Sequence, residues 1–305
     1  MLWFKCDEII PGVILALIYV ALSLSGVFFY MEYEGIEDVD SHCRVAYSAE
    51  KHIDTFRQKN SSAFVVGFSG EVGRHLLETL DQAKVFSRIV LIGRRTINLD
   101  HLGPEFEQRR VRFDLLEDYA ETFDGLDYGF CTLGTSHSSV LSAEFNRVDH
   151  DYVLKTAEVA KAKGCKHFTV VSSHGADSNS SFFFKQAKGL MEETLMEMKF
   201  DRLSIFRPGV LLCDRKEHRP GDTIFQSLLR PIAYFFPTAV TLPVETAAIA
   251  MLNNVIAPNN RTVDIYENKA IHVVAGMASQ YCPPELVPLK HHDHSFHHKD
   301  HDSEF

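Results

Sequence analysis

An α/β fold built on a doubly wound parallel sheet is the fold class that the sequence predicts. From about residue 61 to residue 209, short apolar runs alternate with segments of helical periodicity, an order typical of parallel strands between two layers of helices. A glycine-rich turn directly follows the first apolar run, where such sheets bind their ligands. A long uncharged stretch near the N-terminus adds a transmembrane helix to this prediction.

The composition limits the classes of function. The chain has 305 residues, of which 45% are hydrophobic, enough to bury one sizeable core. A net charge of -10 excludes DNA or RNA as the main ligand, because nucleic-acid phosphates require clustered lysine and arginine. The six cysteines form no CxxC pair, and we interpret them as the reduced thiols of a reducing compartment.

The elements of the predicted fold follow in order. Residues 1–31 form the predicted membrane anchor, an acidic linker and a polar helix occupy 32–60, and the α/β domain covers 61–275. Helical spacing predicts helices over 72–83, 145–164 and 182–199. Apolar runs predict strands at 63–68, 88–93, 111–115, 128–134, 167–173 and 202–208.

Two segments near the C-terminus depart from this alternation. Residues 219–242 are rich in Phe and Pro, and a small substrate-side region or a packed irregular loop fits them equally well. Residues 276–305 carry a histidine cluster, and we predict a disordered tail there. We expect no metal site in this tail, because no scaffold fixes the tetrahedral spacing of its imidazoles.

Three glycines lie between the first predicted strand and the helix after it. Gly67 permits a tight turn, Gly70 lets backbone N–H groups approach a pyrophosphate, and Gly73 allows close packing of helix and strand. A turn without a ligand is the alternative. We favour a Rossmann-type domain that binds a nicotinamide dinucleotide, and the turn also includes Ser69, Glu71 and Val72.

Arg94 and Arg95 follow the second strand, where an NAD-specific domain carries an acidic residue for the ribose 2′-hydroxyl. Guanidinium groups instead provide paired donors for a 2′-phosphate, so we predict NADP(H) as the cofactor. A solvated basic loop is the alternative.

Other predicted cofactor residues follow the next two strands. Asp114 and Leu115 end the predicted third strand and would bracket the adenine, although Asp114 is equally suited to cap a helix. Leu133 and Gly134 follow the fourth strand, at the crevice where ligands gather in open α/β sheets, and we expect both to line the cofactor.

Several further segments accompany this turn along the chain. In order, they are GFSGEVGR, LIGRR, FCTLGT, DYVLKTAEVAKAKGCKHF, VSSHGAD, KFDRLSIFRPGVLLCDR and ENKAIH. Together they resemble the Tat-interacting protein 2 family of atypical short-chain dehydrogenase/reductases, over roughly residues 46–275. The resemblance implies an NADPH-binding Rossmann domain in a regulatory protein, with effects on transcription, translation, apoptosis and nuclear transport receptors.

The resemblance also implies a Ser, Tyr and Lys constellation, in which Tyr transfers a proton, Lys assists it and holds the ribose, and Ser orients a carbonyl. Ser172 and Ser173 match the serine, of which we favour Ser173, and Lys188 matches the lysine. Phe184 occupies the tyrosine position and has no proton to transfer, so we expect a bound cofactor without the usual hydride transfer. A displaced acid, His174, is the alternative.

Residues after the sixth strand complete the predicted site by the same resemblance. Arg219 would reach a cofactor phosphate, with a solvated loop as the alternative. Four others would pass near the nicotinamide, with core packing as the alternative for Pro208 and Leu211: Arg207, Pro208, Gly209 and Leu211.

Three functions are compatible with these residues. They are an NADP(H)-binding regulatory or redox-sensing protein, an active reductase with a rearranged site, and a membrane-tethered interaction scaffold. We favour the first, because a complete phosphate-binding turn accompanies Phe184.

The uncharged stretch at residues 9–30 is long enough to cross a hydrocarbon core of about 30 Å, and a cleaved signal peptide is the alternative. Flanking charges leave the topology open. Asn-x-Ser/Thr triplets at Asn60, Asn179 and Asn260 would be glycosylation candidates in a luminal domain. On cofactor and cysteine grounds, we expect the domain to face the cytosol from the endoplasmic reticulum or another endomembrane.

Overall fold

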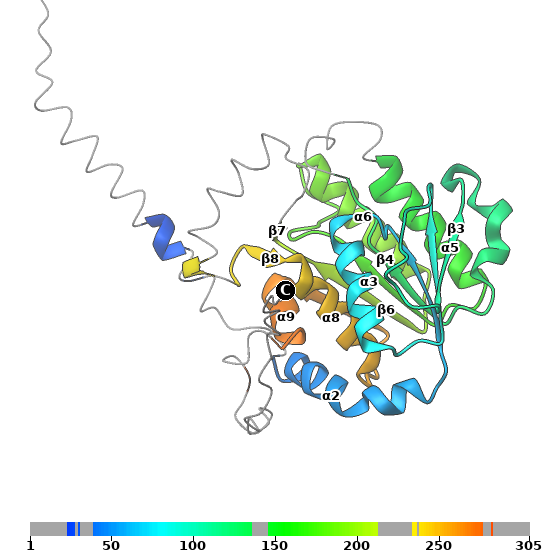
Figure 1. Ribbon diagram of the computed structural model, residues 1–305. Helices are drawn as coiled ribbons and strands as arrows, with labels where there is room; N and C mark the ends of the chain where they lie inside the picture. The colour runs from blue at the N-terminus through cyan, green and yellow to red at the C-terminus, as the bar shows by residue number, and fades with distance from the viewer. Residues whose placement is uncertain are drawn as a thin grey trace, which may run out of the picture.

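The computed structural model describes residues 23–27, 30, 39–135, 146–212, 234–236, 238–276 and 282 (Figure 1). Within these residues, one sheet of parallel strands has the order β3-β2-β1-β4-β5-β6-β9, and β7 and β8 form a second, short parallel pair. The strands of the large sheet are β1 Ser62–Val66, β2 Arg88–Gly93, β3 Phe106–Arg110, β4 Tyr128–Cys131, β5 His167–Val171, β6 Arg202–Arg207 and β9 Val263–Glu267. The short pair comprises β7 Val210–Leu212 and β8 Thr241–Pro243.

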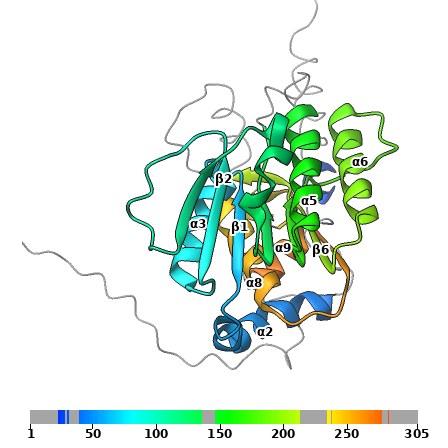
Figure 2. The ribbon, with the colours of Figure 1, turned by 90° about the vertical axis from the view of Figure 1, so that its right-hand side faces the viewer.

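Helices cover both faces of the large sheet, so the predicted doubly wound α/β architecture is confirmed for this domain. One face carries α2 Val39–Arg57, α3 Glu71–Ala83, α8 Val244–Ile256 and α9 Asn268–Val274. The other carries η1 Phe113–Phe123, η3 Arg147–Asp151, α5 Tyr152–Ala162 and α6 Phe183–Glu197. Figure 2 shows α5 and α6 together on one side of the molecule.

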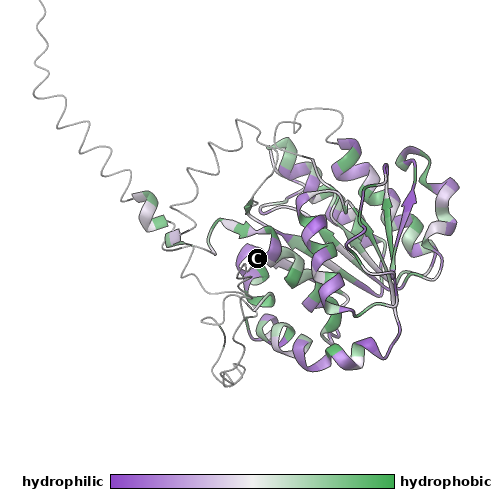
Figure 3. Ribbon diagram, in the orientation of Figure 1, coloured by the Kyte–Doolittle hydropathy of each residue, from purple (hydrophilic) through white to green (hydrophobic). Residues whose placement is uncertain are grey.

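The core is divided by the sheet into two apolar layers. Along β1, Val65 packs into the layer under α3 and α8, whereas Phe64 and Val66 pack into the layer under α5 and η1. Side chains of a strand point to alternate faces, and a strand covered on both faces is apolar throughout. Figure 3 shows hydrophilic and hydrophobic residues alternating along the helices, as expected of helices that bury one face.

The third strand lies earlier in the chain than predicted. The prediction of a strand at 111–115 is wrong, because β3 comprises residues 106–110, with the sequence FEQRR. This strand ends the sheet order and is partly exposed, so its side chains need not be apolar. The apolar residues of the predicted strand, Val111 and Phe113, are buried beside η1 instead.

The predicted N-terminal transmembrane helix is wrong as part of the fold. No helix in the part of the chain that the structure describes is long and apolar enough to cross a membrane. Of the stretch 9–30, only residues 23–27 and 30 belong to that part. Most of the predicted tail at 276–305 and of the segment 219–242 also lies outside the described residues.

Helix α2 extends the predicted polar helix toward the N-terminus and packs against α8 and α9. Cys43 on this helix forms a disulfide with Cys282, with a Cα–Cα distance of 5.7 Å. The interpretation of all six cysteines as reduced thiols is therefore wrong for this pair. The two cysteines are 239 residues apart, so no local spacing marked them.

Candidate functional site

The glycine turn has a geometry that only glycine permits at two positions. Gly67 has a φ of +86°, and a Cβ on it would lie 2.6 Å from the backbone carbonyl carbon of Thr132. A Cβ on Gly73 would lie 2.3 Å from the carbonyl oxygen of Gly67. Gly70 caps helix α3, and its N–H donates to that same oxygen at 2.9 Å. The turn therefore holds the start of α3 against the carboxyl ends of β1 and β4.

This arrangement suits a dinucleotide pyrophosphate. The first turn of α3 begins at Glu71, and the N–H groups of a helix N-terminus bind anions. At Gly67 and Gly73 a side chain would collide with the backbone of neighbouring segments, so only glycine allows the tight turn that brings the start of α3 to this edge. Ser69, Glu71 and Val72, also predicted, lie in or directly after the turn.

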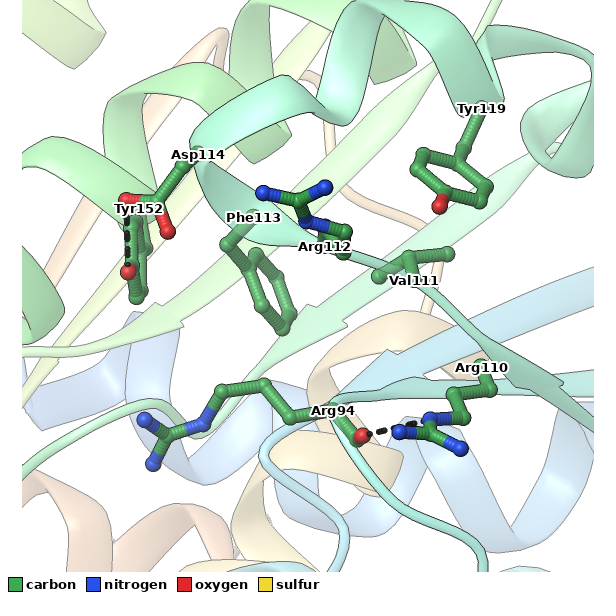
Figure 4. A pocket seen from close by; sticks show the side chains of 8 residues that line it. All are labelled: Arg94, Arg110, Val111, Arg112, Phe113, Asp114, Tyr119 and Tyr152. Atoms are coloured by element: carbon green, nitrogen blue, oxygen red, sulfur yellow. Dashed lines mark hydrogen bonds between the residues drawn. The ribbon is translucent and has the colours of Figure 1, made fainter.

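A cavity of about 350 Å³ opens beside the carboxyl ends of β2 and β3 (Figure 4). Arg94 follows β2, Arg110 ends β3 and Arg112 comes two residues later, and all three line the cavity. Arg110 Nε donates to the backbone carbonyl oxygen of Arg94 at 3.2 Å, and the Arg94 guanidinium points away from Arg110 (Figure 4). The other lining residues are Val111, Phe113, Asp114, Tyr119 and Tyr152. This volume is within the range of small-molecule sites.

Asp114 lines the cavity, but it comes from the first turn of η1 and not from the predicted strand. Its carboxylate accepts a hydrogen bond from the Tyr152 hydroxyl at 2.9 Å. Burial raises the pKa of Tyr152, and the hydrogen bond to Asp114 raises it further. Leu115 is 42% exposed on η1 and does not line the cavity, and its place beside the adenine stays a prediction.

Lys188, the predicted lysine of the constellation, is held in a buried ion pair. Its Nζ lies 3.0 Å from Asp149 Oδ1, and both side chains are only 4% exposed. The other carboxylate oxygen of Asp149 accepts hydrogen bonds from Thr135, at 2.8 Å from the backbone N–H and 2.7 Å from the hydroxyl. Asp149 thus connects η3, the segment after β4 and α6. Phe184 is half-buried in the first turn of α6, one turn before Lys188.

The two candidate serines differ in their surroundings. Ser172 is buried, and its hydroxyl donates to the carboxylate of Glu192, which is 1% exposed. Glu192 also accepts from Arg207 Nε at 3.1 Å. Ser173, the favoured candidate, is half-buried directly after it. The structure thus places Ser173 at the carboxyl end of β5, with Ser172 committed to Glu192.

Arg207 bridges Glu192 to Glu267 at the ends of β6 and β9. Its Nη1 lies 2.9 Å from Glu267, which also accepts from His174 Nδ1 at 3.1 Å. The carboxylate of Glu192 is the main cause of a raised pKa of Arg207. Burial raises the pKa of Glu267, but the hydrogen bonds with His174 and Arg207 outweigh it and leave the pKa lowered.

The remaining predicted residues are spread over the ligand edge of the sheet. Leu133 and Gly134 follow β4, and a Cβ on Gly134 would lie 3.5 Å from Asp149 Oδ1. Leu211 lies in β7 opposite Leu242, and the N–H of Gly209 donates to Asn268 at 2.7 Å. Arg95 is exposed beside Arg94 and does not line the cavity, Pro208 is buried, and Arg219 lies outside the described residues.

Several residues of the site escaped the sequence argument. Arg110 and Arg112 were missed because the third strand was placed too late. Asp149 was missed because its partners lie on distant segments. A buried lysine is almost always paired with an acidic residue, so a search for such a partner on the preceding predicted helix could have found Asp149. Glu192 and Tyr152 carry no local signal at all.

Comparisons with known proteins agree with this geometry. Residues 67–220 match a family described as NAD(P)H-binding. Protein HTATIP2 of Rattus norvegicus is 45% identical over 219 residues, covering 72% of this chain and 90% of the rat protein. The chain belongs to the Tat-interacting protein 2 family. This confirms the resemblance and shows that the cofactor is a nicotinamide dinucleotide.

More distant relatives are fungal. A protein of Scheffersomyces stipitis, named FMP52-1, mitochondrial, is 32% identical, covering 51% of this chain and 69% of its own. The Candida albicans protein FMP52, mitochondrial, is 30% identical, covering 55% of this chain and 75% of its own. These names do not fit an anchor in the endoplasmic reticulum, and no described helix supports one. The predicted anchoring of a cytosol-facing domain to an endomembrane is therefore wrong.

Solved structures share the fold at low sequence identity. MoeE5 in complex with UDP-glucose and NAD has a TM-score of 0.52 at 15% identity, covering 68% of this chain and 75% of that one. The UDP-glucose 4-epimerase of Thermotoga maritima has a TM-score of 0.51 at 15% identity, covering 68% and 76%. At this identity, the likeness shows that the chain has a Rossmann-type fold and shows nothing more.

Proposed function

We propose that this protein holds NADP(H) as a regulatory or redox-sensing ligand and does not reduce carbonyl compounds by the Ser-Tyr-Lys route. The observation that carries the proposal is Phe184, one helical turn before a lysine whose charge is already balanced by the buried Asp149. A nicotinamide cofactor supplies two-electron hydride chemistry when bound. That chemistry also needs a proton donor and groups that orient the substrate, which the protein itself must provide.

The glycine turn and the arginine cavity support tight binding of the phosphorylated dinucleotide. The N-terminus of α3 would hold the pyrophosphate, because the turn exposes backbone N–H groups to it. Arg94 and Arg112 would hold the 2′-phosphate, since both line the cavity at the end of β2 and β3. An unphosphorylated ribose offers these guanidinium groups no matching anion, so we expect NADP(H) to be preferred over NAD(H).

The catalytic half lacks a suitable proton donor at the expected place. A phenyl ring cannot exchange a proton, and general acid–base catalysis typically contributes about 10²–10⁴-fold to the rate. Lys188 points its ammonium group at Asp149, at 3.0 Å, and the Ser172 hydroxyl is committed to Glu192. Lys188 and Ser172 are thus each engaged by a buried carboxylate. We therefore expect the protein to bind the nicotinamide cofactor without oxidising or reducing it.

A binding selectivity experiment tests the cofactor half of the proposal. Thermal-shift titrations of NADPH and NADH would be compared for the wild type, Arg94→Gln and Arg112→Gln. Each substitution removes charge-assisted hydrogen bonds worth about 1.5–3 kcal/mol, so we expect NADPH affinity to fall by roughly tenfold or more and NADH affinity to change little. Arg109→Gln is the matched control, because Arg109 lies in β3 three residues before Arg112, pairs with Glu107 at 2.8 Å and does not line the cavity. Equal losses for Arg109→Gln and Arg112→Gln, or no preference for NADPH, would contradict this half.

The regulatory part of the proposed function requires that cofactor binding changes the surface to which protein partners bind. We expect NADPH to slow hydrogen exchange in the first turn of α3 and in residues 106–123, which surround the proposed phosphate sites. The resemblance implies nuclear transport receptors as partners, and we infer a cofactor-dependent contact with a protein partner. A partner that binds the NADPH-loaded protein and the Gly67→Ala variant equally well would contradict regulation through the cofactor.

An active reductase is the second candidate, and His174 is the residue that favours it. Its imidazole is 57% exposed at the carboxyl end of β5, directly after Ser173, and hydrogen-bonds to Glu267. Cofactor oxidation with a screen of aldehydes and ketones would support this candidate. Loss of cofactor oxidation in the His174→Asn variant would then identify His174 as the proton donor.

A further inference from the structure

We propose that this chain matures in an oxidising, glycosylating compartment and carries N-linked glycans at Asn60, Asn179 and Asn260. Two observations lead to this proposal, and they are independent of each other. One is the pairing of Cys43 with Cys282. The other is the position of all three Asn-x-Ser/Thr triplets in the folded chain.

The disulfide indicates the redox character of the compartment. Structural disulfides form and persist where the surroundings are oxidising and are rare among proteins of the reducing cytosol. Cys43 is fully buried and packs with Val273 of α9, so the bridge fastens α2 and residue 282 to the domain. Its formation transfers two electrons and two protons from the thiols to a dithiol-disulfide oxidoreductase, whose own disulfide is reduced.

The unpaired thiols of the described residues are shielded from such exchange. Cys131, in β4, and Cys165, just before β5, are both buried. Burial raises the pKa of Cys131 to about 11 and that of Cys165 to about 12. Because the thiolate is the form that attacks disulfides, neither thiol would react with disulfide oxidants once the domain has folded. Both features are compatible with an oxidising compartment.

Each of the three asparagines lies on an exposed connection. Asn60 is exposed in the turn between α2 and β1, Asn179 between β5 and α6, and Asn260 between α8 and β9. A glycan is large and needs a surface position on a loop, and a buried asparagine in any of the three triplets would have excluded it. In the modification, the amide nitrogen of asparagine forms a bond to the anomeric carbon of the sugar. The amide gives up a proton, and the lipid pyrophosphate of the sugar donor leaves.

Two of the three proposed glycans lie away from the cofactor edge of the sheet. Asn60 and Asn260 precede parallel strands, so they lie at the edge of the sheet opposite the glycine turn. Asn179 follows β5 and lies on the same edge as Ser173. We therefore expect glycans at Asn60 and Asn260 to have no effect on NADPH binding. In that compartment the protein would not meet nuclear transport receptors, so the glycosidase test also decides against or for the partners that the resemblance implies.

The test uses the full chain expressed in cells with a secretory pathway. Treatment with peptide N-glycosidase should increase gel mobility, and Asn60→Gln, Asn179→Gln and Asn260→Gln should each remove one part of the shift. Thr262→Ala should act like Asn260→Gln because it removes the hydroxyl of that triplet. Asn98→Gln is the control, because Asn98 is exposed on a loop but lies in no triplet.

The disulfide is measured in the same samples. Under denaturing, non-reducing conditions, a thiol-reactive polymer should add once more to Cys43→Ser and once more to Cys282→Ser than to the wild type. A chain whose mobility does not respond to the glycosidase overturns the proposal, even with the disulfide formed, because oxidising compartments without glycosylation also exist. Free thiols at both positions in a glycosylated wild type would overturn the role of the disulfide. A missing part of the shift would overturn the assignment of that asparagine.

Discussion

The two halves of the ligand edge use polar side chains in opposite ways. On the side of β2 and β3, Arg94, Arg110 and Arg112 surround a cavity, and Arg94 is exposed to solvent. On the side of β5 and β6, charged groups such as Lys188 and Glu192 are buried and bonded to other side chains. The first half presents charges to a ligand, and the second half satisfies its charges internally.

This difference indicates where binding free energy is available. An exposed guanidinium group can exchange its hydration for a phosphate at small cost, because little structure depends on it. A buried ion pair can release neither partner without leaving an uncompensated charge. We therefore assign recognition of the cofactor phosphate to the first half and structural stability to the second.

The largest effect is expected for Asp149→Ala. This substitution leaves Lys188 buried without its carboxylate and also removes the acceptor for Thr135. Removal of one partner of a buried pair typically costs about 3–5 kcal/mol in the free energy of unfolding, which urea denaturation measures. Arg112→Ala is the control from the other half and should change stability by less than about 0.5 kcal/mol. Similar losses for both variants would contradict the division.

A smaller effect is expected for Tyr152→Phe, which removes a hydrogen bond within the binding half. The Tyr152 hydroxyl donates to Asp114 at 2.9 Å, and a bond of this type contributes about 1 kcal/mol to the free energy of unfolding. Asp114 then meets solvent in the cavity, so its carboxylate can be rehydrated at little cost. A loss as large as that of Asp149→Ala would show that this half also depends on internal pairing.

The pH dependence of stability should come partly from Glu267. Its pKa is lowered in the folded protein because hydrogen bonds with His174 and Arg207 outweigh the effect of burial. A lowered folded pKa stabilises the protein above the unfolded pKa, and this contribution is lost as the pH falls through the folded value. Glu267→Gln should therefore flatten the unfolding free energy below pH of about 4.3. Because Glu267 is 48% exposed, the effect should stay below about 1 kcal/mol.

The smallest effect is expected for Phe184→Tyr. The new hydroxyl would provide a proton donor, but Lys188 would still be paired with Asp149. We expect NADPH oxidation with aldehydes and ketones to stay at the level of the wild type. A rate increase of about 10²-fold or more would show that the missing tyrosine alone limits the reaction and that the buried pair does not.

Sequence reasoning succeeded where the signal is local. Gly67, Gly70 and Gly73 lie between a predicted strand and a predicted helix, so their spacing together with that position predicts the tight turn that the structure shows. β3 was misplaced because an edge strand such as FEQRR lacks the apolar pattern of a covered strand. The pairs of Lys188 with Asp149 and of Cys43 with Cys282 join distant segments, and no spacing rule brings them together.

The most direct test of the central claim follows binding and turnover in one sample. NADPH is titrated into the full-length protein in the presence of excess aldehydes and ketones, while nicotinamide fluorescence and the concentration of reduced cofactor are recorded together. We predict a saturable increase in fluorescence, at least about tenfold tighter than for NADH, and no loss of NADPH beyond that of the buffer. The account is contradicted if no saturable increase occurs, or if bound NADPH is oxidised faster than free NADPH.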